Sequence, residues 1–263
     1  MNDLVLEHRD GGLLTLTMNK PDRRNALSGD LLDALLRATE RAAIDPDVRA
    51  VLLKGAGGTF SVGGDVQSMA DPNAWTGGLE HLTGTLRERS RISELLHEMP
   101  KPTIALIEKA AAGAGLSLAL ACDFRIAGAQ AKLTTAFVKV ALSGDFGGAY
   151  FLTKLVGSAK ARELYLTSPV LTGDDALKLG LVTRTAPDAE VATIAQAFAQ
   201  ELANGPTLTV GYIKKNINAA ETRSLADVLA LESLHHSRCM GTDDHREAAN
   251  AFLEKRAASF KAR

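Results

Sequence analysis

The sequence predicts an α/β protein whose last third is helical. Short apolar runs alternate with helix-spaced patterns over the first half of the chain, and the β-branched runs thin out from about Gly147. The chain has 263 residues, of which 46% are hydrophobic and 23% charged, so it can bury a substantial core in one large unit. A single enzyme-sized domain with a helical appendage is therefore expected.

The first elements are a hairpin and a helix. Leu4 to Glu7 and Leu13 to Met18 alternate apolar with other residues on either side of Asp10-Gly11-Gly12, which is typical of a β-hairpin. A helix is expected to begin after Ser28 and to end before Asp45-Pro46. Its apolar residues recur at helical spacing: Leu31, Leu35, Ala38 and Ala42.

The middle of the chain repeats a strand-and-helix order. We expect strands at Val48 to Leu53, Thr103 to Ile107 and Phe124 to Ala127, and a short buried helix at Gly115 to Ala121. Residues 68–83 are rich in Asp, Pro, Asn, Gly and Thr, and predict a mobile surface loop ahead of a helix that ends near Met99. Further on, one helix presents a single apolar face: Val191, Ile194, Ala195, Phe198 and Leu202.

Composition argues against several functional classes. The net charge of −1 gives no basic excess for nucleic acid or an anionic membrane. Cys122 and Cys239 show neither CxxC nor Cys/His ligand spacing, so we expect no disulfide framework, no metal site and a reducing, cytoplasmic location. The first ten residues carry charges and do not resemble a signal peptide, and no apolar run reaches membrane-crossing length.

Two glycine-rich segments are the candidate ligand-binding loops. Residues 58–65 (GTFSVGGD) follow a buried strand, and their small side chains leave backbone N–H groups unshielded. Residues 112–117 (AGAGLS) leave a strand and open a helix, so free N–H groups and the helix dipole point into one space. Either segment alone predicts a turn as readily as a site, whereas the two together indicate a site for an anion or an oxyanion.

Phosphate chemistry is disfavoured. Gly113-Ala114-Gly115 lacks the third glycine of a dinucleotide fingerprint, and the chain has no Gly-Lys-Ser/Thr of a phosphate-binding loop.

The ordered motifs resemble the crotonase, or enoyl-CoA hydratase/isomerase, superfamily over nearly the whole chain. The matching segments are Arg24-Asn25-Ala26-Leu27, Phe60 to Asp65, Ala112 to Asp123, Gly147-Gly148, Leu171-Thr172-Gly173 with Ala176, Gly180-Leu181-Val182 and Ala251 to Arg256. The resemblance implies a spiral of ββα turns with two roughly perpendicular sheets in residues 1–204. It also implies a C-terminal helical oligomerisation region in residues 205–263.

The same resemblance implies a binding site for an acyl-coenzyme A substrate, with no other cofactor. The N–H groups of Gly64 and Ala114 would form the oxyanion hole for the thioester enolate. Coenzyme A would lie against Arg24, Ala26 and the stretch Ser61, Val62, Gly63, Gly64, Asp65 and Val66, with Arg23 and Arg24 near its phosphates. Family members are trimers or dimers of trimers, and Leu225, Val228 and Leu229 are candidates for that contact.

The chain departs from the hydratase pattern. The two glutamates that hold a water in hydratases match Ser117 and Phe137 here, and Asp123, beside Cys122, looks structural. Ser117 has no His/Asp partner by motif, so a packing role is expected. Glu108-Lys109 replaces the usual glycine turn of the family, so a different local turn is expected before Ala114.

Asp145 is the candidate acid/base, because it stands where hydratases commonly have glycine and where some isomerases carry aspartate. Those isomerases are similar to the phenylacetate-pathway and dienoyl-CoA types, and residues 213–222 also resemble the former. The alternative for Asp145 is a carboxylate that caps the helix beginning near Gly147.

Dehalogenation, which related enzymes carry out with an aspartate at this position, is disfavoured because it also needs a matching histidine. His97 sits at a helix end, and His235-His236 have no partner acids at metal-ligand spacing.

An enoyl-CoA isomerase is thus the favoured function, with a hydratase as the alternative. A third reading, of another class, is a non-catalytic acyl-CoA-binding or RNA-associated homologue, which the near-neutral charge disfavours. The acyl group is not predictable, since its specificity would depend on the packing of residues 68–83 and of apolar side chains: Trp75, Leu79, Phe137, Phe146 and Leu152.

Overall fold

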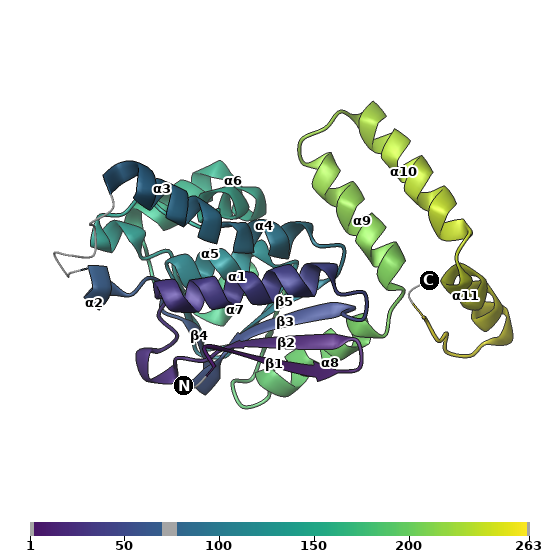
Figure 1. Ribbon diagram of the computed structural model, residues 1–263, viewed down its shortest axis with the longest axis horizontal. Coiled ribbons are helices and arrows are strands. Elements are labelled where there is room, and N and C mark those ends of the chain that lie inside the picture. Colours follow the sequence, from purple (N-terminus) through teal and green to yellow (C-terminus); the bar gives the residue numbers. More distant parts are fainter. Residues whose placement is uncertain (1–2, 70–77, 262–263) are drawn as a thin grey trace.

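A computed structural model describes residues 3–69 and 78–261 of the protein (Figure 1). Its main sheet has six strands in the order β1-β2-β3-β5-β7-β9, and a second sheet has three strands in the order β4-β6-β8. The main strands are β1 (Val5–Asp10), β2 (Leu13–Met18), β3 (Ala50–Gly55), β5 (Thr103–Ile107), β7 (Phe124–Gly128) and β9 (Arg184–Ala186). The short strands are β4 (Thr59–Ser61), β6 (Ala110–Ala112) and β8 (Lys132–Thr134).

The chain forms a ββα spiral, as predicted. Among the named strands of the described residues, β1 and β2 pair antiparallel, and each later strand pairing is parallel. The strands alternate between the sheets: β3 then β4, β5 then β6, β7 then β8, with helices between successive pairs. This alternation brings the ends of β4 and β6, from which both glycine loops emerge, next to each other.

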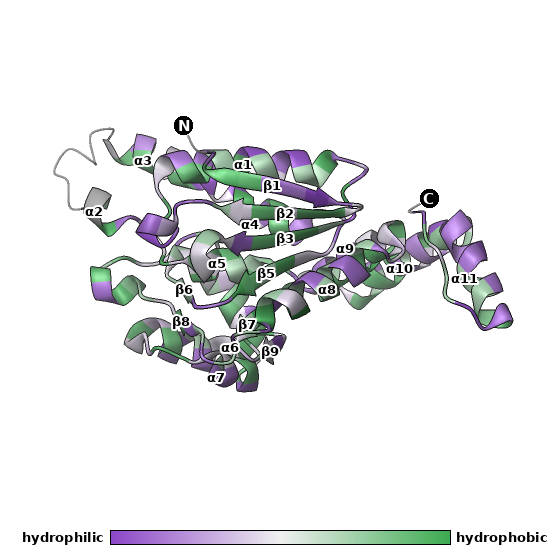
Figure 2. Ribbon diagram, turned by 90° about the horizontal axis from the view of Figure 1, so that it is seen from below, coloured by the Kyte–Doolittle hydropathy of each residue, from purple (hydrophilic) through white to green (hydrophobic). Residues whose placement is uncertain are grey.

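The inner strands β2, β3 and β5 of the main sheet are buried on both faces, which explains why they are nearly continuously apolar. Along β2, Leu13 packs on one face and Leu14 on the other, and the alternation continues through β3 and β5. Helices α1 (Gly29–Ile44), α4 (Arg91–Glu98) and α5 (Ala114–Ala121) cover one face, whereas α8 (Val191–Ala203) covers the opposite one (Figures 1 and 2). The predicted hairpin, the helix after Ser28 and the apolar face of α8 are confirmed.

The described parts of one expected loop are helical. Residues 66–69 form α2 (Val66–Met69), and residues 78–83 belong to α3 (Gly78–Arg89), so the prediction of a loop over 68–83 is wrong for its described parts. Residues 70–77, including Trp75, lie outside the described residues. Because α3 buries none of its side chains completely, its sequence lacks the apolar stripe that would have predicted it.

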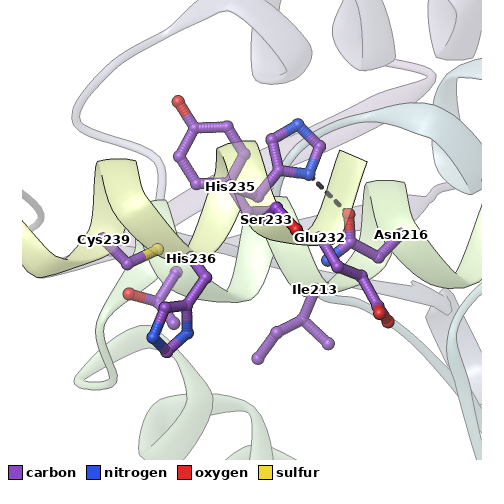
Figure 3. Close-up of a pocket in the computed structure, with 9 residues that line it drawn as sticks. Ile213, Asn216, Glu232, Ser233, His235, His236 and Cys239 are labelled. Atoms are coloured by element: carbon purple, nitrogen blue, oxygen red, sulfur yellow. Dashed lines mark hydrogen bonds between the residues drawn. The ribbon is translucent and has the colours of Figure 1, made fainter. Parts of the chain in front are cut away.

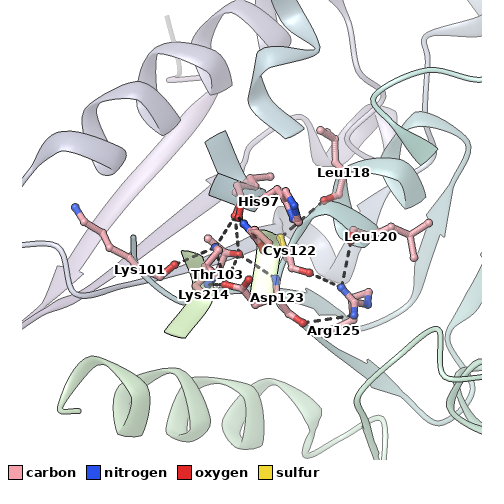
Figure 4. Close-up of polar contacts among 11 residues, drawn as sticks. His97, Lys101, Thr103, Leu118, Leu120, Cys122, Asp123, Arg125 and Lys214 are labelled. Atoms are coloured by element: carbon pink, nitrogen blue, oxygen red, sulfur yellow. Dashed lines mark hydrogen bonds and ion pairs between the residues drawn. The ribbon is translucent and has the colours of Figure 1, made fainter. Parts of the chain in front are cut away.

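The last helices extend to one side of the core (Figure 1). They are α9 (Thr207–Ala220), α10 (Leu225–Met240) and α11 (Asp243–Glu254), and they follow α6 (Gly148–Thr167), α7 (Gly173–Lys178) and α8. Lys214 of α9 is buried and ties this region to the core: its Nζ donates to the Asp123 carboxylate at 2.8 Å and to the carbonyl of Leu96 at 3.0 Å (Figure 4). Asp123 also accepts from the N–H of Thr103 at 2.8 Å, which confirms its structural role.

No helix within residues 3–69 and 78–261 has the length and apolar character needed to span a membrane.

Candidate active site

The two glycine loops are in contact at the start of α5. Gly63 has φ +87°, and a Cβ at this position would lie 2.7 Å from the carbonyl oxygen of Ala112 and 3.3 Å from the backbone nitrogen of Ala114. Only glycine allows both this backbone conformation and this approach. The loop after β4 therefore lies directly against the first residue of α5.

The backbone N–H groups of Gly64 and Ala114 are available to a ligand. Ala114 is the first residue of α5, whose N-terminal N–H groups have no partner within the helix. Within the described residues, neither the N–H of Gly64 nor that of Ala114 donates a hydrogen bond to another residue. The terminal methyl of Met69 covers the position of a Gly64 Cβ at 2.3 Å, so any side chain at Gly64 would need Met69 to move. Two free donors beside an apolar group suit an oxyanion.

The segment expected to bind coenzyme A runs beside this hole. Leu27 donates its N–H to the carbonyl of Gly63 at 2.8 Å, and Val62 donates to the carbonyl of Arg24 at 3.2 Å. Arg24 is exposed and Ala26 is buried next to it. The structure thus brings together the two stretches of the expected site, 24–26 and 61–66.

Arg23, which is expected near the coenzyme A phosphates, already has a carboxylate partner in the protein. Its guanidinium forms an ion pair with the Asp65 carboxylate at 2.9 Å, and it remains half-exposed. The pair joins the same two stretches, and a ligand phosphate would have to compete with Asp65 for this arginine.

The Glu108-Lys109 departure leaves the second sheet intact. The Lys109 N–H donates to the carbonyl of Gly58 at 3.0 Å, and its Nζ donates to the carbonyl of Gly57 at 3.0 Å. Through these two hydrogen bonds, Lys109 holds the segment that leads into the first glycine loop.

Asp145 lies on a loop that contacts the same helix. A Cβ on Gly148 would lie 2.2 Å from the hydroxyl oxygen of Ser117, one helical turn after Ala114. Asp145 precedes Gly148 by three residues, and its carbonyl accepts the Gly148 N–H at 3.0 Å. The start of α5 is therefore flanked by the glycine loop on one side and by the Asp145 loop on the other.

The Asp145 carboxyl is desolvated and has no hydrogen-bonding partner in the described part of the chain. Its Oδ1 is buried without a partner. Burial raises the pKa of Asp145 from 3.8 to about 6. The residue at the start of α6 is Gly147, and no side chain caps this helix, so the alternative of a capping carboxylate is wrong. A carboxyl with a raised pKa and a buried oxygen that has no partner is typical of an acid/base residue.

Residues that sequence patterns do not reveal hold this loop. The Ser93 hydroxyl of α4 donates to the carbonyl of Phe146 at 2.8 Å, where the backbone is left-handed with φ +48°. Tyr165 of α6 places its hydroxyl 2.4 Å from the position of a Gly148 Cβ, beside Ser117. Neither residue belongs to a motif, and only the fold brings them to Asp145.

His97 lies next to the Asp145 loop, where it lines a cavity with Ser93 and Gly147, whereas His235 lies in the last helices. His97 packs edge-on against Phe151 at 5.3 Å between ring centroids. His235 is buried and lines a cavity of about 550 Å³ between α9 and α10. Its Nδ1 is hydrogen-bonded to Oδ1 of Asn216 at 2.5 Å, and its ring stacks on that of Tyr212 (Figure 3). This cavity is roomy, but its lining contains no residue of the two glycine loops or of the Asp145 loop. The cavity therefore belongs to the α9–α10 hairpin and not to the candidate active site.

The spiral fold, the paired glycine loops and the buried carboxyl define an enzyme of the crotonase superfamily. Residues 8–263 match the family described as Enoyl-CoA hydratase/isomerase, and the chain belongs to this family.

Its relatives include both isomerases and hydratases. The chain is 35% identical to the 1,2-epoxyphenylacetyl-CoA isomerase of Escherichia coli K12 over 99% of each chain. It is 31% identical to the short-chain-enoyl-CoA hydratase of Clostridium acetobutylicum, over 97% of this chain and 96% of the relative. A crystal structure of an enoyl-CoA hydratase from Polaromonas sp. JS666 matches with a TM-score of 0.91 and 32% identity, over 98% of this chain and 99% of the other. The fold is thereby confirmed, whereas identities this similar do not separate the two activities.

Proposed function

We propose that the protein is an enoyl-CoA isomerase, which shifts a double bond along the acyl chain of a coenzyme A thioester. The observation that carries this proposal is the desolvated carboxyl of Asp145, on the loop that packs against the helix supplying one of two unused backbone donors. The resemblance to hydratases predicts glutamates at two positions that hold Ser117 and Phe137 here. With Asp145 as its acid and no carboxylate at the two positions that match the hydratase glutamates, the site suits the movement of a proton within one substrate better than the addition of water.

In the proposed mechanism, the thioester oxygen accepts hydrogen bonds from the N–H groups of Gly64 and Ala114. As a proton leaves the acyl chain, negative charge develops on this oxygen, and each preorganised donor contributes roughly 3 kcal/mol to the stabilisation of the enolate. Asp145 takes the proton and, now a neutral acid, returns it to a different carbon of the dienolate. A pKa of about 6 lets one group act as base and then as acid near neutral pH.

The substrate's coenzyme A moiety is proposed to bind along Arg24, Ala26 and residues 61–66. Arg24 is exposed and can reach a phosphate.

We also propose a trimer or a dimer of trimers, because Leu225 and Leu229 of α10 are 74% and 52% exposed. Sedimentation at micromolar concentration tests this assembly, and a monomer would refute it.

The deciding experiment offers 2-enoyl-CoA and 3-enoyl-CoA to the enzyme in deuterated water and follows the products by mass spectrometry. Isomerisation gives a shifted double bond without the mass of added water. Asp145→Asn should lower this rate by roughly 10²- to 10⁴-fold, the usual contribution of general acid–base catalysis. Asp188→Asn, which changes an exposed aspartate near β9, is the matched control and should leave the rate unchanged.

Hydration is the second candidate, because relatives at similar identity are named as hydratases. Formation of 3-hydroxyacyl-CoA at a useful rate, or a fully active Asp145→Asn enzyme, would replace the isomerase assignment. A folded protein that binds acyl-CoA but turns over neither substrate would favour the binding-protein alternative, and retention on nucleic acid would favour the RNA-associated one.

A further inference from the structure

Helix α6 folds back on itself and returns a tyrosine to the Asp145 loop. The helix is broken at Gly157, where φ is +75° and ψ is +160°, and its second half carries Tyr165 back toward the start of its first half. The Tyr165 hydroxyl lies 2.4 Å from the position of a Gly148 Cβ and 3.4 Å from that of a Gly144 Cβ. Tyr165 therefore supports both ends of the short loop that carries Asp145.

Its other neighbours are the residues that stand in place of the hydratase glutamates. The Tyr165 ring stacks on Phe137, with centroids 5.9 Å apart and an interplanar angle of 3°. Its hydroxyl lies beside that of Ser117, since both oxygens are within 2.4 Å of the same Gly148 Cβ position. One tyrosine thus joins Phe137, the helix of the oxyanion hole and the Asp145 loop.

The Asp145 charge also acts on the ionisable phenol of Tyr165. Burial, with a contribution from the Asp145 charge, raises the pKa of Tyr165 to about 12, so its phenol is neutral at any working pH. Among the described residues, the other helices packed on the loop bring hydroxyl groups, Ser93 from α4 and Ser117 from α5, while His97 contacts Phe151 behind it. Exposed Lys139 is the charged residue of the Phe137–Val140 turn.

We propose that Tyr165 is a positioning residue for Asp145: its ring keeps water from one side of the carboxyl, and its hydroxyl, paired with Ser117, holds the Gly144–Gly148 loop against α5. The proposal rests on the proposed role of Asp145 as acid/base, and it adds a residue that no motif contains. Substrate need not touch Tyr165. The effect of Tyr165 on turnover passes through the placement and the solvation of the Asp145 carboxyl.

Two substitutions separate the ring from the hydroxyl. Tyr165→Ala removes both, so water should reach Asp145 and return its pKa from about 6 toward the ordinary 3.8. Tyr165→Phe keeps the ring, so the pKa of Asp145 should stay raised while the loop loses its hydroxyl anchor. We expect kcat to fall at least tenfold in the alanine variant and several-fold in the phenylalanine variant, with KM changed less than threefold in both. Tyr212→Phe in the α9–α10 hairpin is the matched control and should change neither quantity.

The primary measurement is a ¹³C NMR titration of the Asp145 carboxyl carbon, assigned by its loss in Asp145→Asn. It needs no turnover, so it distinguishes failure of this proposal from failure of the isomerase assignment. If the protein does not isomerise but the pKa of Asp145 drops in Tyr165→Ala, the positioning role stands and the isomerase assignment fails. Unchanged pKa and unchanged kcat in folded Tyr165 variants overturn the positioning role. If Tyr165→Ala does not fold, Tyr165→Phe decides through kcat, and a wild-type kcat refutes the proposal.

Discussion

The two halves of the candidate site are built in different ways. The half with Gly64 and Ala114 uses backbone atoms, and these atoms are placed by the parallel pairing of β4 with β6 and by the start of α5. The half with Asp145 uses a side chain on a loop, which is held by hydroxyl groups from two other helices and by the returning end of its own helix. A backbone half tolerates most side-chain changes, whereas the carboxyl half depends on residues far away in the sequence.

The largest effect expected for the backbone half comes from the loss of one of its two N–H donors. Ala114→Pro removes one N–H donor, and because proline is well suited to the first turn of a helix, the fold should remain intact. We expect kcat to fall by roughly 10²- to 10³-fold, as for loss of one oxyanion donor elsewhere.

Ala114→Ser is the control for this substitution, since it changes the side chain and keeps the N–H. It should stay within a few-fold of the wild-type kcat. A correctly folded Ala114→Pro enzyme with undiminished turnover would mean that Ala114 is not part of the hole.

A second prediction concerns how the ionisation of Asp145 lowers the free energy of unfolding. Asp145 has a pKa of about 6 in the folded protein against 3.8 for an unperturbed carboxyl, so the folded state binds more protons between these two pH values. The contribution of Asp145 to the free energy of unfolding should therefore fall as the pH rises from about 4 to about 6, by at most about 3 kcal/mol. Asp145→Asn cannot ionise and should be more stable than the wild type above pH 6.

Urea unfolding of both proteins across this range tests the linkage. The stability difference should be present at pH 7.5 and should shrink toward pH 4. A difference that does not change with pH would show that Asp145 is not the buried, ionising group that the geometry indicates.

The same contrast explains what the sequence could predict. The hairpin, α1, β5 and α5 follow from apolar periodicity and from glycine-rich loops, which are local signals, and the resemblance pointed to Gly64, Ala114 and Asp145. By contrast, β9 and the strands of the small sheet have only three residues each, too few for a period, and their pairing comes from neighbouring strands. The start of α3 was predicted as a loop because this helix buries no side chain completely and is stabilised by ion pairs such as Arg89 with Asp33 at 2.8 Å.

The surroundings of Asp145 were not predictable for a related reason. Its raised pKa depends on burial by segments that pack around it, and Ser93 and Tyr165 are 52 and 20 residues away in the sequence. No spacing rule connects these positions, since the contact of Tyr165 depends on the break in α6. That break is itself a testable part of the carboxyl half.

The smallest expected effect therefore comes from Gly157, which touches nothing in the site. A Cβ at this position would meet no atom within 4 Å, so Gly157→Ala creates no clash. Its backbone, however, has φ +75° and ψ +160°, a region open almost only to glycine, and an alanine there should cost about 1–3 kcal/mol in unfolding free energy. Alanine also favours a continuous helix, which would carry Tyr165 away from the Asp145 loop and lower kcat several-fold.

Gly84→Ala in α3 is the matched control. A Cβ at Gly84 also meets nothing within 4 Å, but the backbone there is not left-handed. This substitution should therefore be neutral or stabilise the protein by up to about 1 kcal/mol. Thermal unfolding and kcat of the two variants separate the possibilities. Equal losses in both would show that the backbone conformation at Gly157 is not the cause, and a destabilised Gly157→Ala enzyme with wild-type kcat would show that the break in α6 is not what places Tyr165 beneath the Asp145 loop.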